Sequence, residues 1–220
     1  MMTSANANVL HIDGSPGKPE RIPDRRLVPA LTVDVEDYFQ VEAFKSVVDR
    51  AGWDSQPSRV VENTQHVLGL FGKTDTRATF FVLGWVAERF PEIVRQIKSG
   101  GHEVASHGYS HELADGQTRG EFRNDIRRSK AILEDVSGDR VRGFRAPTFS
   151  VGPANWWVYE VLAEEGYEYS SSVYPIAHDL YGMPDAPRTM FRPVKDHAFV
   201  EIPISTIRLF KQQRPCGGGG

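Results

Sequence analysis

The stretch Leu27-Val28-Pro29-Ala30-Leu31-Thr32-Val33 predicts a short buried strand, because it is almost wholly apolar. The acidic cluster Asp34-Val35-Glu36-Asp37 follows at its end. Further strands are predicted at 79–83, 102–106, 141–145, 168–171 and 197–203. Patterns with apolar residues on one helical face separate them, at 58–70, 84–97, 118–133 and 153–165. Strands that alternate with helices predict a parallel α/β sheet or barrel.

The pair of histidines in His107-Gly108-Tyr109-Ser110-His111 follows the predicted strand at 102–106. Histidines spaced i and i+4 lie on the same side of a helical turn, so both imidazoles can reach one metal ion. Parallel α/β folds carry their sites at the carboxyl ends of strands. We therefore expect the histidine pair, the acidic cluster and Arg145 at one edge of the sheet. Two histidines and one carboxylate form many hydrolytic metal sites.

The residue that supplies the carboxylate is open at this point. On an extended strand Asp34 and Glu36 face the same side and Asp37 faces the other, which favours Glu36 as the third ligand. A turn after Val35 would present Asp37 instead. In a third interpretation the whole acidic cluster caps a helix near 41–50.

Length and composition indicate a single α/β domain, or at most two small ones, of an ordinary globular protein. The chain has 220 residues, 40% of them hydrophobic and 25% charged. A net charge of −3 gives no reason to expect nucleic acid or an anionic membrane as a partner. The single cysteine, Cys216, excludes an internal disulfide framework and a multi-cysteine zinc site. No pattern specifies an oligomeric state.

The segment 1–26 is polar and predicts a flexible leader, with the folded domain at 27–220. It has no apolar run of the kind found in secretory signals, and no stretch approaches the length of a membrane span. The sequence thus predicts a cytoplasmic protein that does not insert into membranes.

The motifs described above resemble those of the polysaccharide deacetylase family of metal-dependent amide hydrolases. The family's Thr-x-Asp-Asp strand end resembles Thr32 to Asp37, its His-x-x-x-His motif is matched by His107 and His111, and its Arg-x-Pro motif by Arg145-Ala146-Pro147. The variant Asp-Val-Glu-Asp-Tyr-Phe and the segment 181–187 are similar to the branch associated with bacterial exopolysaccharide loci. The resemblance implies a distorted (β/α) barrel of seven or eight strands, one divalent metal ion such as zinc, and an N-acetylated glycan as substrate.

The resemblance also implies roles for individual residues. Asp34 matches the catalytic base, and Arg145 would hold it ionised and oriented, although a plain salt bridge at a strand end is the simpler interpretation of Arg145. His107 and His111, with Glu36 or Asp37, would hold the metal. The residues expected to line the substrate groove are Pro147, Phe149, Tyr174 and His178.

The family's fifth motif, Leu-x-His, supplies a histidine that protonates the leaving amine. No Leu-x-His follows Arg145 in this chain, whereas 201–205 resembles the segment that precedes the motif. We therefore expect a truncated relative with an incomplete barrel that binds metal but reacts slowly, unless His178 or His197 replaces the acid. Two alternatives are an allantoinase-like hydrolase of a small cyclic amide and a catalytically impaired remnant that binds glycan or metal.

Overall fold

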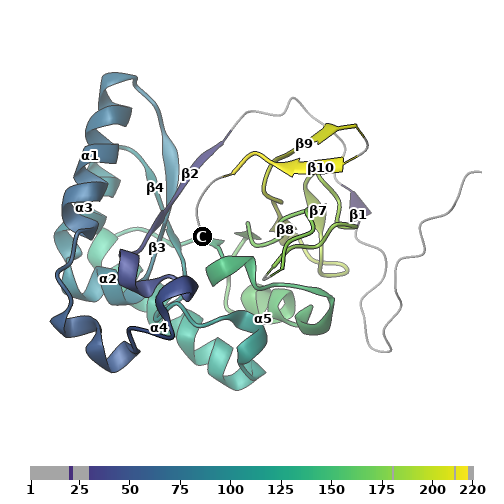
Figure 1. Cartoon of the computed structure of the whole chain (residues 1–220), viewed down its shortest axis with the longest axis horizontal. Helices are drawn as coiled ribbons and strands as arrows, with labels where there is room; N and C mark the ends of the chain where they lie inside the picture. Colours follow the sequence, from purple (N-terminus) through teal and green to yellow (C-terminus); the bar gives the residue numbers. More distant parts are fainter. Residues whose placement is uncertain (1–19, 22–29, 180, 211, 218–220) are drawn as a thin grey trace, which may run out of the picture.

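The computed structural model describes residues 20–21, 30–179, 181–210 and 212–217 of the chain. Its main sheet has eight strands in the order β1-β7-β8-β6-β5-β4-β3-β2 (Figure 1). Six of them pair in parallel: β2 (Leu31–Val35), β3 (Ala78–Val82), β4 (Glu103–Ser106), β5 (Gly143–Phe144), β6 (Tyr169–Ser170) and β8 (Val200–Glu201). The antiparallel strands β7 (Phe191–Arg192) and β1 (Glu20–Arg21) complete the sheet. A mostly parallel sheet with helices is consistent with the predicted distorted (β/α) barrel.

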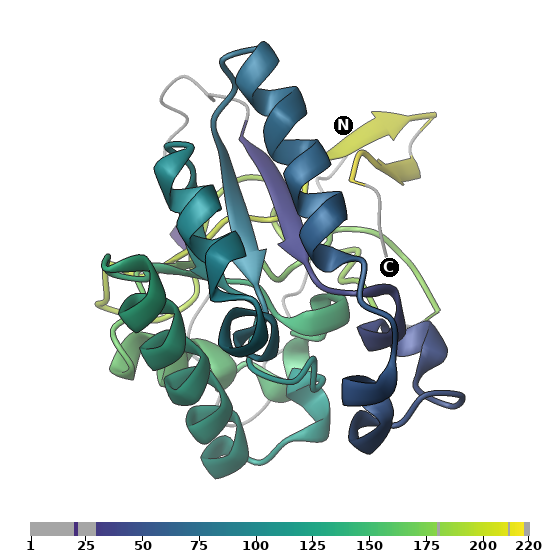
Figure 2. The same ribbon diagram turned by 90° about the vertical axis from the view of Figure 1, so that its left-hand side faces the viewer.

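Helices connect the parallel strands. They are α1 (Val60–Lys73), α2 (Gly84–Arg89), α3 (Pro91–Ser99), α4 (Arg119–Ser137) and α5 (Val158–Glu164). Short 3₁₀ turns lie between them: η1 (Tyr38–Gln40), η2 (Glu42–Phe44), η3 (Arg50–Ser55), η4 (Ala114–Gly116), η5 (Pro147–Phe149) and η6 (Pro153–Asn155). Figure 2 shows β2, in purple, running alongside a parallel strand and leading into the turns η1–η3. A separate hairpin, β9 (Thr206–Leu209) and β10 (Gln212–Pro215), lies across the molecule from α1 and α3 (Figure 1).

Local sequence explains where the helices begin and end. Thr118 accepts the Glu121 N–H while the Glu121 side chain accepts the Thr118 N–H, and this capping box starts α4. Gly138, with a φ of +65°, ends the same helix because glycine adopts the left-handed region at little cost. Pro91 starts α3 and separates it from α2, as the sequence predicts. The core lies between helices and sheet, and in β3 the side chains of Phe80, Phe81 and Val82 are all buried.

Some predicted boundaries are wrong. Within the described residues, the strand predicted at 27–33 begins at Leu31 and continues through Val35, so Asp34 belongs to the strand instead of following it. Most of the predicted leader lies outside the described residues, but Glu20–Arg21 pairs with β7. The helix considered near 41–50 is replaced by the turns η2 and η3. No helix in the described ranges combines the length and the apolar character needed to cross a bilayer.

Candidate metal centre and active site

The register of the parallel strands brings their carboxyl ends into one row. Val35 is opposite Val82, Val82 is opposite Ser106, Ser106 is opposite Phe144, and Phe144 is opposite Ser170. The residues that follow these ends include Glu36, His107, Arg145 and Ser171. The predicted meeting of three strand-end clusters at one edge is therefore confirmed.

Glu36, His107 and His111 form a compact group at this edge. One ligand atom from each lies within 4.8 Å of the others, and no other group of three or more such residues occurs in the part of the chain described here. Glu36 Oε2 is 2.8 Å from His111 Nε2 and 3.8 Å from His107 Nε2. Both histidines are buried, while the Glu36 side chain is 18% exposed. The three residues thus converge on one small volume that solvent reaches from the Glu36 side.

The tautomer of His107 is set by the backbone of Arg145. His107 Nδ1 lies 2.9 Å from the carbonyl oxygen of Arg145, and a carbonyl can only accept, so Nδ1 donates. The lone pair is then on Nε2, which faces Glu36, as in histidines that bind metal. Burial lowers the pKa of His107 against the opposing charges of Asp34 and Glu36, which favours this neutral form.

The carboxylate of Glu36 fits a metal ligand as well. Burial raises its pKa, but the contact with His111 and the charges of both imidazoles lower it more, so the net shift is downward and favours the ionised form. Its Oε2 atom is buried and, despite its proximity to His111 Nε2, has no hydrogen bond of good geometry among the described residues. Glu36 Oε2 and the Nε2 atoms of the two histidines lie close enough together for one cation to contact all three. Two imidazoles and a carboxylate are a donor set that zinc accepts.

Asp37, the alternative carboxylate, points away from the histidines. Its Oδ2 accepts from Ser58 Oγ at 2.6 Å, from Arg59 N at 2.8 Å and from Val60 N at 3.2 Å, at the start of α1. Its Oδ1 accepts from Tyr38 N at 3.0 Å. The backbone at Asp37 is extended, so Glu36 and Asp37 face opposite sides. This geometry argues against Asp37 as a ligand. Asp37 instead caps η1 and the start of α1, and not a helix near 41–50 as in the third interpretation.

The loop that carries the histidines is not the helical turn that their spacing suggests. Residues 107–111 have no helical structure, and Gly108 and His111 have φ values of +77° and +52°. A left-handed φ at a residue other than glycine costs about 1–3 kcal/mol and persists where surrounding contacts hold it. The prediction of a helical turn is therefore wrong, although the two imidazole rings still meet, with centroids 5.4 Å apart.

Arg145 makes far more contacts than a plain salt bridge. Its Nη1 donates to Asp34 Oδ1 at 2.7 Å and to Thr32 Oγ1 at 3.0 Å. Its Nε and Nη2 donate to the carbonyl and the hydroxyl of Ser171, each at 3.0 Å. The guanidinium is buried and lies 4.1 Å from the ring centroid of Phe81. Asp34 is thus fixed from one side by Arg145, and its side chain remains 27% exposed.

The residues predicted to line the substrate groove divide into two groups. Pro147 and Tyr174 are buried, and the Tyr174 hydroxyl donates to the carbonyl of Gly217 at 3.1 Å, so both support the fold from within. Phe149 is half-buried 5.7 Å from the Arg145 guanidinium, and His178 is exposed. Sequence reasoning missed Tyr181, whose ring stacks on His178 at 4.0 Å and lies 5.6 Å from Phe149.

Further contributors to the site also escaped prediction. Thr32 and Ser171 hold Arg145, and Gln40 accepts the Asp37 N–H at 2.7 Å. Two of them had a signal in the sequence: Thr32 is the first residue of the motif Thr32 to Asp37, and Ser171 ends the strand predicted at 168–171. His197, considered as a substitute acid, lies in an exposed turn where its Nδ1 accepts the Phe199 N–H.

Comparison with known proteins agrees with this fold. The family model "Polysaccharide deacetylase" matches residues 51–170, which are more than half of the chain, and "Domain of unknown function (DUF3473)" matches residues 171–220. The chain therefore belongs to the polysaccharide deacetylase family. His107, His111 and Arg145 lie within the matched range, whereas Asp34 and Glu36 precede it.

Individual relatives cover parts of the chain. A peptidoglycan deacetylase from Helicobacter pylori is 34% identical over 112 residues, which are 49% of this chain and 36% of that protein. A peptidoglycan-N-acetylglucosamine deacetylase from Bacillus cereus is 36% identical over 87 residues, which are 40% of this chain and 32% of that protein. The chain thus spans about a third of the length of these curated relatives.

Solved structures show the same fold. A Mycobacterium smegmatis protein whose structure is described as a polysaccharide deacetylase superposes with a TM-score of 0.64 and 29% identity, over 87% of this chain and 63% of that one. A CE4 family pseudoenzyme from Bacillus anthracis has a TM-score of 0.51 and 20% identity, over 67% of this chain and 44% of that one. The second likeness concerns the fold alone.

Proposed function

We propose that this chain is a metal-dependent N-deacetylase that removes acetyl groups from an N-acetylated polysaccharide. The observation that carries the proposal is the group Glu36, His107 and His111 at the same strand edge as the ion pair of Asp34 with Arg145. The names of the relatives, which include a chitooligosaccharide deacetylase from Sinorhizobium fredii at 33% identity over 96 residues, support an N-acetylated glycan. Those 96 residues are 43% of this chain and 44% of that protein. The domain 27–220 would carry the activity, in the cytoplasm.

The chain's own residues supply most of the chemistry. Glu36, His107 and His111 would hold the metal, with zinc as the proposed ion. When bound, such an ion makes water acidic and polarises the amide carbonyl. Asp34, partly exposed beside this group, takes the proton from the attacking water. Arg145 keeps the Asp34 carboxylate in one orientation, since four of its hydrogen bonds fix the guanidinium.

The half-buried and exposed rings next to Arg145 favour a sugar over a small cyclic amide. Phe149, Tyr181 and His178 form a row of ring contacts that leads from the guanidinium toward exposed surface. Aromatic rings give pyranose sugars a flat apolar surface, whereas a small cyclic amide would not reach beyond the first ring. The finer proposal of an exopolysaccharide substrate rests on the sequence of 32–39 and 181–187.

Acetate release tests the proposal directly. The full chain is treated with a chelator and assayed with and without added zinc on N-acetylglucosamine oligomers, with allantoin as a second substrate. We expect acetate from the oligomers only with zinc, and no turnover of allantoin. Zinc binding without acetate release would favour the catalytically impaired remnant. Release that survives removal of all metal would contradict the proposal.

A further inference from the structure

The three residues between the two histidines are held on both sides by helices. The carbonyl of Gly108 accepts from Gly84 N and from Ser129 Oγ, each at 2.9 Å, and the carbonyl of Tyr109 accepts from Trp85 N at 3.0 Å. These contacts come from the start of α2 and from the middle of α4. They fix the carbonyl groups of Gly108 and Tyr109. The Gly108 N–H donates to Ser106 Oγ at 3.2 Å, which leaves the Tyr109 N–H to another partner.

Asp125 of α4 is that partner. Its Oδ2 accepts the Tyr109 N–H at 2.9 Å. The carboxylate packs so closely against Gly108 that a Cβ atom there would lie 2.9 Å from Oδ2. The N–H group of Tyr109, two residues before His111, is thus bound by this carboxylate.

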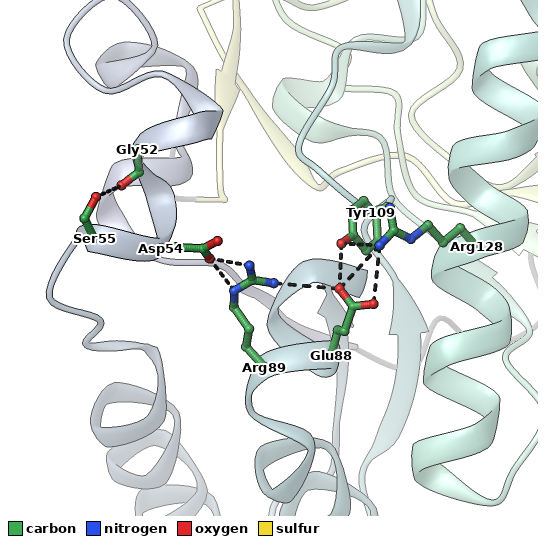
Figure 3. A network of polar contacts seen from close by, with 7 residues as sticks. All are labelled: Gly52, Asp54, Ser55, Glu88, Arg89, Tyr109 and Arg128. Carbon is green, nitrogen blue, oxygen red and sulfur yellow. Dashed lines mark hydrogen bonds and ion pairs between the residues drawn. The ribbon is translucent and has the colours of Figure 1, made fainter.

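The same face of α4 also holds the side chain at the middle of the loop. Arg128, one turn from Asp125, lies 3.5 Å from the ring centroid of Tyr109 and donates to its hydroxyl at 2.6 Å. The Tyr109 hydroxyl donates to Glu88 Oε2 at 2.7 Å, and Figure 3 shows this ring between Glu88 and Arg128. The side chain of Tyr109 therefore points toward α2 and α4.

We infer that Asp125 is a positioning residue for the metal ligands: through the Tyr109 N–H group and its packing on Gly108 it fixes the loop that carries His111 relative to His107. The inference rests on the metal site proposed above and extends it to a residue that touches neither metal nor substrate. The left-handed backbone of His111 gives the reason, because such a conformation is kept only where neighbouring contacts determine it. Without the carboxylate, the His111 imidazole is free to leave the common volume.

The size of the effect depends on the solvent beside Asp125. Loss of a residue that orients metal ligands typically weakens metal binding about 10–100-fold. A cavity of about 620 Å³ borders Asp125, Tyr109 and Ser110, so water can replace the lost acceptor in part. We therefore expect the lower end of that range, about tenfold.

The test measures zinc affinity instead of turnover. Wild type, Asp125→Ala and Asp125→Asn are freed of metal and titrated with zinc against a chromophoric chelator, and their folding is followed by circular dichroism. We expect dissociation constants about tenfold higher for Asp125→Ala and intermediate for Asp125→Asn, which keeps one acceptor oxygen. Thr118→Ala is the matched control, because it removes the cap of the same helix without contacting the loop.

The outcomes separate this inference from the proposed function. If wild type binds zinc and Asp125→Ala binds it equally tightly, the inference is wrong and the metal site stands. If Thr118→Ala weakens binding as much as Asp125→Ala does, the effect belongs to helix stability and the inference is again wrong. If wild type itself binds no zinc, both are overturned.

Discussion

The two halves of the sheet hold the site by different means. Strands β2, β3 and β4 have four or five residues each and pair along their whole length, and the turns after β2 and β4 carry Glu36 and His107. Strands β5, β6 and β8 have only two residues each. Arg145 follows β5 on this side of the sheet, and its guanidinium contacts Asp34 on β2. We call β2, β3 and β4 the regular half of the sheet and β5, β6 and β8 the irregular half. In the function proposed above, metal binding thus depends on the regular half, and the orientation of the proposed base Asp34 depends on the irregular half.

Side chains replace strand pairing in the irregular half. The fully buried Glu201 of β8 accepts the N–H groups of Ser172 and Val173 at 2.8 and 2.9 Å. The Ser172 hydroxyl accepts the Ala146 N–H at 2.9 Å, next to Arg145. Short strands joined by buried polar groups are sensitive to the loss of a single group, because an unpaired buried donor costs about 1–3 kcal/mol. This difference predicts that variants in the regular half lose zinc binding, whereas variants in the irregular half lose reaction rate at an unchanged zinc affinity.

The largest effect is expected from the regular half. His107→Ala removes a buried imidazole from the proposed metal site, so we expect zinc binding to be lost and acetate release to fall about 10³-fold. Metal content and initial rates measure both. His66→Ala is the control, since His66 is exposed on α1. An active, metal-loaded His107→Ala protein would break the assignment of metal binding to this half.

A smaller effect, of a different kind, is expected from the irregular half. Arg145→Lys keeps a cation but loses the forked contacts to Asp34 and Ser171, so we expect the rate to fall about 10²-fold. Zinc affinity should stay at the wild-type value, because His107 bonds the backbone carbonyl of residue 145. Zinc titration beside the rate assay checks this. A parallel loss of zinc affinity would show that the halves are not separable.

Variants of the adjacent residues Glu36 and Asp37 are expected to differ, the first in zinc binding and the second in the free energy of unfolding. Asp37→Ala leaves Ser58, Arg59 and Val60 without their common acceptor, so we expect a loss of about 2 kcal/mol in the free energy of unfolding. Urea unfolding of the metal-free protein measures it. Glu36→Ala should instead abolish zinc binding with little loss of stability. The reverse pattern would make Asp37 the ligand.

The smallest effect is expected in the pH dependence of stability. Burial raises the pKa of Glu201 above its usual value, against hydrogen bonds from Val173, Ser170 and Ser172 that lower it. The folded state then binds this proton more tightly than the unfolded state does. Its contribution is complete below the unfolded pKa of about 4.3 and is lost as the pH rises through the folded value.

Glu201→Gln tests this titration. The amide side chain of this variant cannot ionise and still offers an oxygen to the Ser172 and Val173 N–H groups. The unfolding free energy of the variant should therefore fall less from pH 4 to pH 8 than that of wild type. Urea unfolding across this range measures the difference. Equal slopes for the two proteins would show that Glu201 does not titrate there.

Much of this arrangement could be predicted from sequence. The alternation of strands and helices and the meeting of the strand ends at one edge were predicted from the order of the elements. The period of two along a strand favoured Glu36 over Asp37 but left the choice open. The loop at the histidines was wrongly predicted as a helical turn, because a spacing of four residues fits a tight loop as well as a helix. Strand β7 was missed because it has only two residues and pairs with the distant β1. Strands β9 and β10, which pair with each other in a local hairpin, were also missed.

The roles of Asp125 and Glu201 could not be predicted from the sequence. Each is an acidic residue inside an ordinary helix or strand, and its role is defined only by the backbone N–H groups that the fold brings to it. Tyr109 is 16 residues from Asp125 and Ser172 is 29 residues from Glu201 along the chain, so no local sequence pattern indicates these hydrogen bonds.

Residue 145 acts through its side chain and through its backbone carbonyl, and mutation changes only the side chain. Its guanidinium orients Asp34, while its carbonyl oxygen sets the tautomer of His107. Every amino acid has that carbonyl, so a genetic screen at residue 145 reports on the base alone and misses the link to the metal ligand. A chemically synthesised segment, with the amide between residues 145 and 146 replaced by an ester, would weaken this carbonyl as an acceptor, and it would also remove the Ala146 N–H that donates to the Ser172 hydroxyl.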